Sequence, residues 1–350
     1  MRIKILFPYT GNSFGGSHVS SSIFLKNCEL NFHIYLFEDG EFSKILKKEN
    51  KLKHEFINLN YVKSNFIIKK FFQILISIRL VSFLKNNNFD IVHTNDIPMH
   101  LTWFLPSLLS KTKHVWHQRT PNNKAIFLSL FSNLLTISNY TKNSFPIFLQ
   151  KKATVIYNPF EVFKFSKKEI SKTPKIGFVG NLIKRKNVDV FIKIIANLDN
   201  NFKGIIFGEK REPVYTDAIK EISNLKIKDK IDFKGLVFPI EKYLSKIDIL
   251  IAPATDEAFG RNLVEAMMLG IPVLALDYGG HKEIIENGVD GFLIKNNNID
   301  VYIEKIKLLV DNPDVYQIIS KKAHLKAKNK FGVDMHVKKM IKCYNEILIK

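Results

Sequence analysis

The sequence predicts an α/β protein made of two Rossmann-like, doubly wound domains, each built on a parallel sheet. The chain has 350 residues, about twice the length of a typical domain. Short runs rich in Ile and Val alternate with helix-length segments, and they lack the alternating polar positions of a half-exposed strand, as expected of buried parallel strands. A hydrophobic fraction of 46% is large enough to supply two cores.

The elements fall into two series along the chain. The first series has predicted strands at residues 4–8, 33–37, 91–94, 114–117, 135–138 and 154–157. The second has them at residues 175–179, 203–207, 231–234, 249–252, 272–275 and 291–294, and the pattern is helical after about residue 300. A polar, lysine-rich connector, bracketed by Pro159 and Pro174, joins the two series.

These boundaries predict three parts. We expect a first Rossmann-like domain over residues 1–165, a second over 166–332, and a C-terminal helix over 333–350 that packs back on the first domain. Open α/β sheets bind ligands at the carboxyl ends of their strands. The two domains are therefore expected to face a central cleft, with the functional residues in the loops that follow strands.

The formal net charge is +20, from 53 Lys and Arg against 33 Asp and Glu. Such a balance is typical of proteins that bind nucleic acid, an anionic membrane surface or an anionic substrate. Only six of the basic residues are Arg, however, and proteins that read bases favour Arg for its bidentate geometry. The excess of Lys, Asn, Ile and Phe is also what an AT-rich coding sequence produces. We therefore expect no nucleic-acid partner.

Cysteine usage and hydropathy predict a cytoplasmic protein. Cys28 and Cys343 form no CxxC pair and have no His cluster beside them, so neither a disulfide nor a cysteine metal site is expected. Residues 1–9 are too short for a signal peptide, and the apolar stretches 66–84 and 125–138 are interrupted or too short to span a bilayer. Residues 66–85 are interpreted either as an interfacial amphipathic helix or as an ordinary packing helix. An anionic surface on the inner face of the cell membrane is therefore a candidate partner.

The segment with the most chemical information is residues 252–280, APATDEAFGRNLVEAMMLGIPVLALDYGG. A predicted strand ends in a loop that carries Glu257, and a helix starting near Gly260 carries Glu265. Both carboxylates can reach one ligand from these positions, and the amides at the helix start suit an anion such as a diphosphate. Taken alone, two such glutamates are equally consistent with solvated surface residues.

The residues around this pair resemble those of the retaining GT-B glycosyltransferases of glycosyltransferase family 4. That family has two glutamates separated by seven residues, with FG after the first and EAM-x-x-G-x-PV around the second. The matching residues here are Glu257, Phe259, Gly260, Glu265, Ala266, Met267, Gly270, Pro272 and Val273, followed by GGHKEIIENGVDG over 279–291.

The resemblance implies a donor and an acceptor. It implies the GT-B fold and transfer of a hexose-type sugar from a UDP- or GDP-linked donor, with retention of configuration and without a metal or other cofactor. The acceptor would be a glycan or lipid-linked sugar in surface polysaccharide or lipopolysaccharide synthesis. By the same resemblance, the domain over residues 1–165 would bind the acceptor and the domain over 166–332 the nucleotide sugar.

The same resemblance implies roles for single residues. Glu257 and His117 would contact the donor sugar and Lys186 the donor phosphates, which makes these three the expected catalytic residues. The expected donor-binding residues are Gly15, Gly16, Gly180, Asn181, Arg185, Lys186, Gly208, Phe259, Gly260, Arg261, Asn262 and Glu265. Asn181 departs from the pattern, which has Arg there, so that positive charge is either missing or supplied by Lys184 or Arg185. His93 is interpreted as structural, acceptor-side or catalytic.

Two alternative functions stay open at this point. A GT-B sugar-nucleotide epimerase would share the fold and the donor site, but the glutamate spacing and its FG and EAM context favour transfer. A non-catalytic nucleic-acid binder would explain the charge but not the two glutamates.

Overall fold

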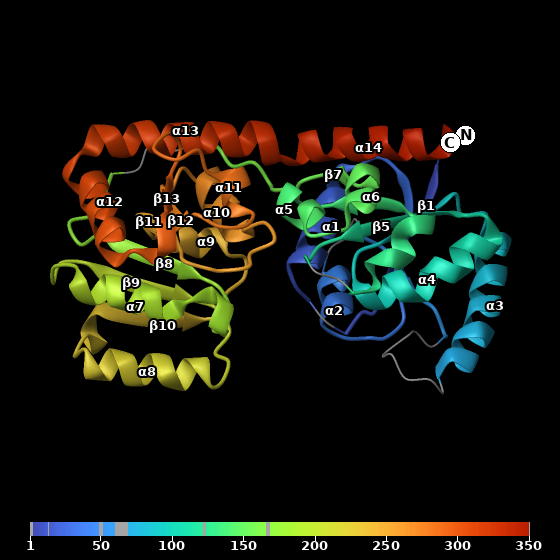
Figure 1. The fold of residues 1–350 in the computed structure, drawn as a ribbon, viewed down its shortest axis with the longest axis horizontal. Coiled ribbons are helices and arrows are strands. Elements are labelled where there is room, and N and C mark those ends of the chain that lie inside the picture. The colour runs from blue at the N-terminus through green and yellow to red at the C-terminus, as the bar shows by residue number, and fades with distance from the viewer. Residues whose placement is uncertain are drawn as a thin grey trace. The chain divides into compact units, whose positions relative to one another are not determined.

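The computed structural model describes residues 3–12, 14–48, 52–59, 69–121, 124–165 and 169–349 (Figure 1). The chain forms two compact units. Unit 1 comprises Met1–Pro159 and Val333–Lys350, and unit 2 comprises Phe160–Gly332. The units divide at Pro159 and Phe160, six residues before the boundary that the sequence predicts, and each unit is described by itself.

Unit 1 contains a seven-stranded sheet in the order β3-β2-β1-β4-β5-β6-β7, with every neighbouring pair parallel. Its strands are β1 (Lys4–Tyr9), β2 (Asn31–Leu36), β3 (His54–Phe56), β4 (Ile91–Thr94), β5 (Lys113–Gln118), β6 (Asn133–Thr136) and β7 (Thr154–Val155). Strand β3 is missing from the sequence prediction because its three residues, HEF, form a partly exposed edge with no apolar run. Strand β6 begins two residues earlier than predicted, and Ser138 instead caps a helix.

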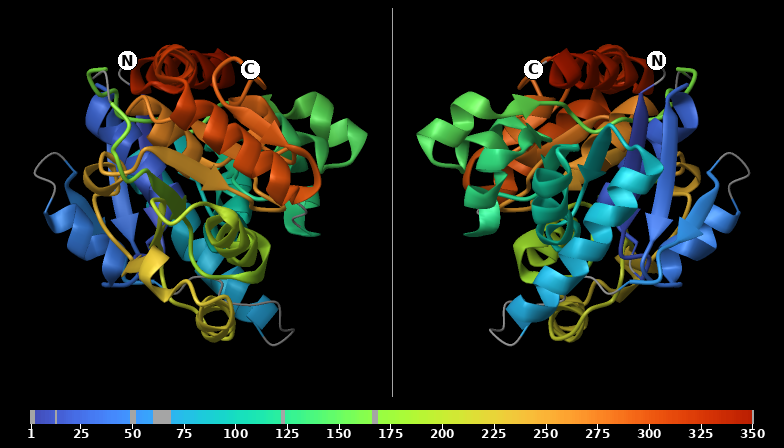
Figure 2. Two further views of the ribbon diagram at one scale, coloured as in Figure 1. Left: turned by 90° about the vertical axis from the view of Figure 1, so that its left-hand side faces the viewer. Right: turned by 90° about the vertical axis from the view of Figure 1, so that its right-hand side faces the viewer.

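Helices cover both faces of this sheet, which makes the unit doubly wound (Figures 1 and 2). Helices α1 (Gly16–Asn27), α2 (Glu41–Lys47) and α14 (Val333–Ile349) share one core with β1, β2 and β4. Helices α3 (Lys69–Asn87) and α4 (Ile97–Ser110) form the core of the other face around Trp103. The remaining helices are η1 (Lys124–Phe131), α5 (Asn139–Asn143) and α6 (Ile147–Lys152). The C-terminal helix thus belongs to unit 1 although the rest of its sequence neighbourhood belongs to unit 2.

Unit 2 contains a six-stranded parallel sheet in the order β10-β9-β8-β11-β12-β13. Its strands are β8 (Lys175–Val179), β9 (Lys203–Phe207), β10 (Ile231–Gly235), β11 (Ile249–Ala252), β12 (Val273–Leu276) and β13 (Phe292–Ile294). The helices are η2 (Lys184–Lys186), α7 (Val188–Asn197), α8 (Val214–Asn224), η3 (Lys228–Lys230), α9 (Glu241–Leu244), α10 (Arg261–Met268), α11 (His281–Ile284), η4 (Lys295–Asn297), α12 (Ile299–Asp311) and α13 (Pro313–Phe331). All six strands were predicted. Most of them are short apolar runs bounded by polar turns, whereas β10 (IDFKG) alternates partly buried and exposed residues.

The order of the strands reverses direction between β8 and β11, since the chain first adds β9 and β10 on one side and then β11 to β13 on the other. In open α/β sheets this switch point is where ligands bind. The loops that follow β8 and β11 therefore define the place in unit 2 where the functional residues are expected. The predicted fold class, two Rossmann-like parallel-sheet domains, is confirmed.

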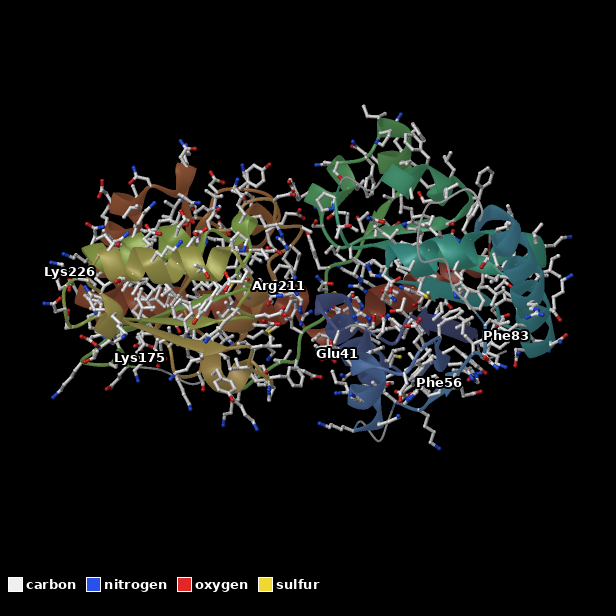
Figure 3. The ribbon with its side chains drawn as sticks, turned by 90° about the horizontal axis from the view of Figure 1, so that it is seen from below. Glu41, Phe56, Phe83, Lys175, Arg211 and Lys226 are labelled. Carbon is white, nitrogen blue, oxygen red and sulfur yellow. The ribbon has the colours of Figure 1, made fainter. Side chains whose placement is uncertain are left out.

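Many of the lysines are dispersed on the surface. Lys175 and Lys226 are exposed residues of unit 2, and both are labelled on that unit in Figure 3. Within the described ranges, no helix combines the length and the apolar character needed to cross a bilayer.

Candidate active site

The predicted cations and the first predicted glutamate meet in unit 2. The Glu257 carboxylate accepts hydrogen bonds from the Lys186 ammonium and, at 3.1 Å, from the Arg185 guanidinium. The Glu257 and Lys186 side chains are only 16% and 15% exposed, whereas Arg185 is 44% exposed. Each charge therefore has a partner, which is what partly buried ions require.

Backbone hydrogen bonds hold these three residues together. Lys186 ends η2, directly after β8, and Glu257 follows β11, the neighbouring strand. The Thr255 amide donates to the Arg185 carbonyl at 2.8 Å, and the Asn187 side-chain amide donates to the Pro253 carbonyl at 2.9 Å. These bonds join the loop after β8 to the loop after β11. The backbone that carries Arg185, Lys186 and Glu257 is therefore held in place by hydrogen bonds. The sequence motif does not reveal the contributions of Thr255 and Asn187.

The electrostatics of Glu257 reflect two opposing effects. Burial by itself raises the pKa of this carboxyl, but the charges of Lys186 and Arg185 and the hydrogen bond from Lys186 outweigh burial and bring the pKa below its ordinary value. Glu257 is therefore an anion throughout the physiological pH range.

His281 is a further buried polar residue next to this loop. Its Nδ1–H donates to the Leu276 carbonyl at 3.0 Å, which leaves the lone pair on Nε2. Within the described part of the chain that Nε2 atom is buried and has no hydrogen-bond partner. Burial lowers the pKa of His281, so its imidazole stays neutral. From the sequence, His281 is a candidate for a further lining of the ligand cleft, because it follows the GG turn of the LALDYGG segment.

The second predicted glutamate lies on α10. This helix begins at Arg261, after Gly260, whose φ of 102° is in the left-handed region that favours glycine. Glu265 pairs with Arg261 at 3.1 Å, and both side chains are less than 20% exposed. The Asn262 side chain donates to the Val179 carbonyl at 2.9 Å, which ties the start of α10 to the end of β8. The first turn of α10 thus lies at the strand ends.

Phe259 occupies a different environment from the other predicted donor-binding residues. Its side chain is 2% exposed and packs between the rings of Phe160 and Phe331, whose centroids are 6.1 Å and 5.5 Å away. The structure therefore places the Phe259 ring in the core beneath the loop, where it supports Gly260.

Asn181 and Gly208 connect the ends of β8 and β9. The Asn181 side-chain oxygen accepts a hydrogen bond from the Glu209 amide at 3.3 Å, and the Gly180 amide donates to the Phe207 carbonyl at 2.9 Å. A Cβ atom on Gly208 would lie 2.0 Å from the Gly180 carbonyl oxygen. Asn181 thus bridges two loops, and it is Arg185 that joins Lys186 as a cation at Glu257.

The short distance between Gly208 and the Gly180 carbonyl oxygen predicts that Gly208→Ala destabilises unit 2. The φ of Gly208 is 151°, and its Cβ would overlap backbone, so we expect a loss of more than about 2 kcal/mol in unfolding free energy, measured by urea denaturation. Gly15→Ala is the control, because nothing lies within 4 Å of its Cβ position. Equal midpoints for the two variants would contradict the predicted role of Gly208.

The remaining predicted residues lie in unit 1. Gly15 and Gly16 stand at the start of α1, directly after the loop that follows β1. His117 is near the end of β5 and is 1% exposed. Its Nδ1 is 3.1 Å from Nε2 of His93, on β4. The structure therefore brings together the two histidines that the sequence analysis treats separately.

Unit 2 has a cavity of about 500 Å³ at the carboxyl ends of β11, β12 and β13. Its lining consists of Thr255, Leu276, Asp277, Tyr278, Lys295, Asn296 and Asn297. Thr255 is shared with the loop that carries Glu257, and Leu276, Asp277 and Tyr278 belong to the LALDYGG segment, which the sequence suggests as a further lining of the ligand site. Lys295, Asn296 and Asn297 are absent from the sequence prediction because they match no motif. Among the side chains that the structure describes, no group of three His, Cys, Asp or Glu residues is arranged to hold a metal ion.

The parallel-sheet units and their strand order define the GT-B class of fold. The Anabaena protein HepE, solved with UDP and glucose, has a TM-score of 0.85 to this chain, with 20% identity over 98% of this chain and 99% of that one. This similarity establishes the fold.

A family model matches the second half of the sequence. Residues 159–326 match the family Glycosyl transferases group 1. The resemblance seen in the sequence is thus confirmed at the level of this family.

Two curated relatives match part of the chain. An uncharacterised glycosyltransferase of Methanocaldococcus jannaschii is 29% identical over 61% of this chain and 59% of its own length. The poly(ribitol-phosphate) α-N-acetylglucosaminyltransferase of Staphylococcus aureus is 25% identical over 61% of this chain and 40% of its own length. The matches therefore span about half the length of these relatives.

Proposed function

We propose that the protein is a retaining glycosyltransferase that moves a hexose-type sugar from a UDP- or GDP-linked donor to a glycan or lipid-linked acceptor. The observation that carries the proposal is the cluster of Glu257, Lys186 and Arg185 at the strand ends of unit 2, beside the start of α10. The match of residues 159–326 to Glycosyl transferases group 1 supports the same activity.

Lys186 and Arg185 have the charge that a departing diphosphate needs. Transfer breaks the bond between the anomeric carbon and a β-phosphate oxygen, so negative charge develops on the phosphate and positive charge on the sugar. Fixed cations and helix-terminal amides stabilise that phosphate charge without a metal ion. We assign this role to Lys186, Arg185 and the first amides of α10.

The carboxylates suit the hydroxyl groups of the donor. Each can accept two hydroxyl hydrogen bonds, so we assign Glu257 to the donor sugar and Glu265 to the ribose. The acceptor oxygen forms the new bond to the anomeric carbon, and its proton passes to the leaving phosphate. In unit 1 we assign His117 to contact with a sugar.

A transfer assay tests this proposal. The protein is incubated with UDP- and GDP-linked hexoses in EDTA, nucleotide release is measured with and without a glycan acceptor, and the anomeric configuration of the product is read by NMR. We expect acceptor-dependent release of one nucleotide and a product with the donor's configuration. Conversion of the sugar nucleotide to its epimer without transfer would favour an epimerase, and an inverted product or a strict metal requirement would contradict the proposed mechanism.

The exposed apolar side chains of unit 1 support a membrane partner. Leu108, Leu109, Phe127, Leu128, Leu130, Phe131, Ile147 and Phe148 lie at the end of α4, on η1 and on α6 and are all exposed; we name them the η1 surface. Ring contacts join the three elements: the centroids of Phe127 on η1 and Phe148 on α6 lie 6.2 Å apart, and those of Phe131 on η1 and Phe104 on α4 lie 6.0 Å apart.

Three lysines lie at the ends of the helices that form the η1 surface. Lys111 follows α4, and Lys151 and Lys152 end α6, with the Lys152 ammonium donating to the Ser129 carbonyl of η1 at 3.3 Å. Apolar side chains beside cations are suited to an anionic bilayer, where each basic residue contributes about 1 kcal/mol. We propose that the η1 surface binds an anionic membrane. Part of residues 66–85, the segment named in the sequence analysis, lies outside the described residues.

Vesicle sedimentation tests this membrane contact. We expect wild-type protein to bind phosphatidylglycerol vesicles at low salt, and the double variant Phe127→Ser, Phe131→Ser to bind about tenfold more weakly, because each Phe loses apolar burial. Phe238→Ser is the matched control, since Phe238 of unit 2 is 66% exposed and Phe131 is 65% exposed. Equal loss in the control, or no binding of wild-type protein, would refute the proposal.

A further inference from the structure

Three buried side chains of unit 1 form a hydrogen-bonded series. The Tyr344 hydroxyl on α14 is 2.6 Å from Nδ1 of His93 on β4, and Nε2 of His93 is 3.1 Å from Nδ1 of His117 on β5. Their exposed fractions are 0%, 2% and 1%. The Phe7 ring stacks on His93 at 4.9 Å with an interplanar angle of 23°, which fixes the orientation of its imidazole plane. The series therefore has a defined geometry.

The direction of the hydrogen bond from the Tyr344 hydroxyl determines where the protons of the two histidines lie. Burial lowers the pKa of His93 and of His117 well below the usual value, so each imidazole is neutral and has one N–H. A buried phenol must place its proton on an acceptor, and in the described structure the hydrogen bond of Tyr344 goes to Nδ1 of His93. Tyr344 is therefore the donor.

The donor role of Tyr344 determines which nitrogen carries the proton in His93 and then in His117. Because Nδ1 of His93 accepts, its proton is on Nε2 and is donated to Nδ1 of His117. The proton of His117 is then on Nε2. A second polar neighbour of His93, Asn95, acts as an acceptor. Its side-chain oxygen accepts hydrogen bonds from Arg119, and its hydrogen bond with His93 raises the pKa of that imidazole, which is compatible with a proton on Nε2 of His93.

The last atom of the series is unpaired. Within the described ranges, Nε2 of His117 is buried and has no hydrogen-bond partner. A buried N–H without an acceptor is costly, so a ligand oxygen that accepts from it would gain a full hydrogen bond.

We propose that Tyr344 is a positioning residue that sets the proton order of His93 and His117, so that His117 offers an Nε2–H donor to a sugar hydroxyl oxygen. Only the identity of the ligand as a sugar rests on the proposed function. Without the phenol proton the two neutral forms of each histidine would be close in energy, and His117 would present a donor in some molecules and an acceptor in others. The C-terminal helix thus has a function besides packing.

Nitrogen NMR of the full chain tests the proposal directly. Protein labelled with ¹⁵N-histidine is measured by long-range ¹H–¹⁵N correlation at pH 7, and the His117 signals are assigned by their loss in His117→Gln. We expect His93 and His117 both in the Nε2–H form. The Nδ1–H form of His117, or a charged imidazolium, would overturn the proposal.

Replacing the phenol supplies the second test. In Tyr344→Phe we expect the preference of His117 for the Nε2–H form to fall by about tenfold, since one buried hydrogen bond no longer biases it. Tyr316→Phe is the matched control, because the Tyr316 hydroxyl is also buried and donates to the Asp248 carbonyl at 2.8 Å in unit 2. The control is expected to lower the melting temperature to a similar extent and to leave the His117 spectrum unchanged.

The outcomes separate this inference from the proposed function. An unchanged His117 spectrum in Tyr344→Phe would overturn the positioning role, whatever the enzyme transfers. Absence of transferase activity with a normal proton order would instead count against the proposed function.

Discussion

Glu257→Gln is expected to lower the turnover number for sugar transfer by roughly 10²- to 10³-fold, the scale on which loss of one preorganised polar group reduces catalysis. The substitution keeps the shape of the side chain and removes the charge that Lys186 and Arg185 face. Transfer is measured as nucleotide release in the presence of acceptor.

Glu286→Gln is the control for this variant, because Glu286 is an exposed glutamate of the same unit. It should retain wild-type turnover, and thermal denaturation should show that both variants are folded. Near-normal turnover in Glu257→Gln would show that the carboxylate is not part of the reaction.

Lys186→Met is expected to reduce both nucleotide affinity and turnover by roughly 10²-fold or more. Lys186 is the less exposed of the two cations that contact Glu257, and without it the negative charge that develops on the phosphate loses that cation. Lys184→Met is the matched control, since Lys184 lies in the same η2 turn but is exposed. Equal losses in the two variants would indicate a general charge effect and contradict a specific role for Lys186.

The same substitution has a consequence for the pH dependence of stability. Without Lys186, both the charge and the hydrogen bond of that residue no longer lower the pKa of Glu257, so this pKa rises. In wild-type protein the pKa is lowered on folding, so the stabilisation is present above the pKa of the unfolded state and is lost as pH falls through the folded value. The stability difference between wild type and Lys186→Met should therefore be largest near neutral pH and should narrow under acidic conditions.

The motif around Glu257 and Glu265 could be interpreted from the sequence because its chemistry depends on local spacing. A strand, a loop and a helix within about 30 residues suffice to bring both carboxylates to one edge of a sheet. Arg185 was recognised as a candidate for the same reason, and its contact with Glu257, which lies 72 residues away, required the parallel pairing of β8 and β11.

Long-range packing explains what the sequence could not show. Tyr344 lies 251 residues from His93, and nothing in the residues around it indicates a contact with β4. Phe259 was interpreted as a donor-binding residue because it belongs to the motif, whereas its ring is buried between Phe160 and Phe331. The apolar residues of η1 are indistinguishable from core residues until their exposure is known.

We propose that unit 2 binds the diphosphate of a nucleotide sugar through Lys186 and Arg185. Isothermal titration calorimetry with UDP and with GDP tests it most directly. We predict that one of the two nucleotides binds at one site per chain, and that its affinity falls at least about tenfold, or 1.4 kcal/mol, in Lys186→Met but not in Lys184→Met. Failure of both nucleotides to bind, or equal affinity in wild type and Lys186→Met, would contradict the claim.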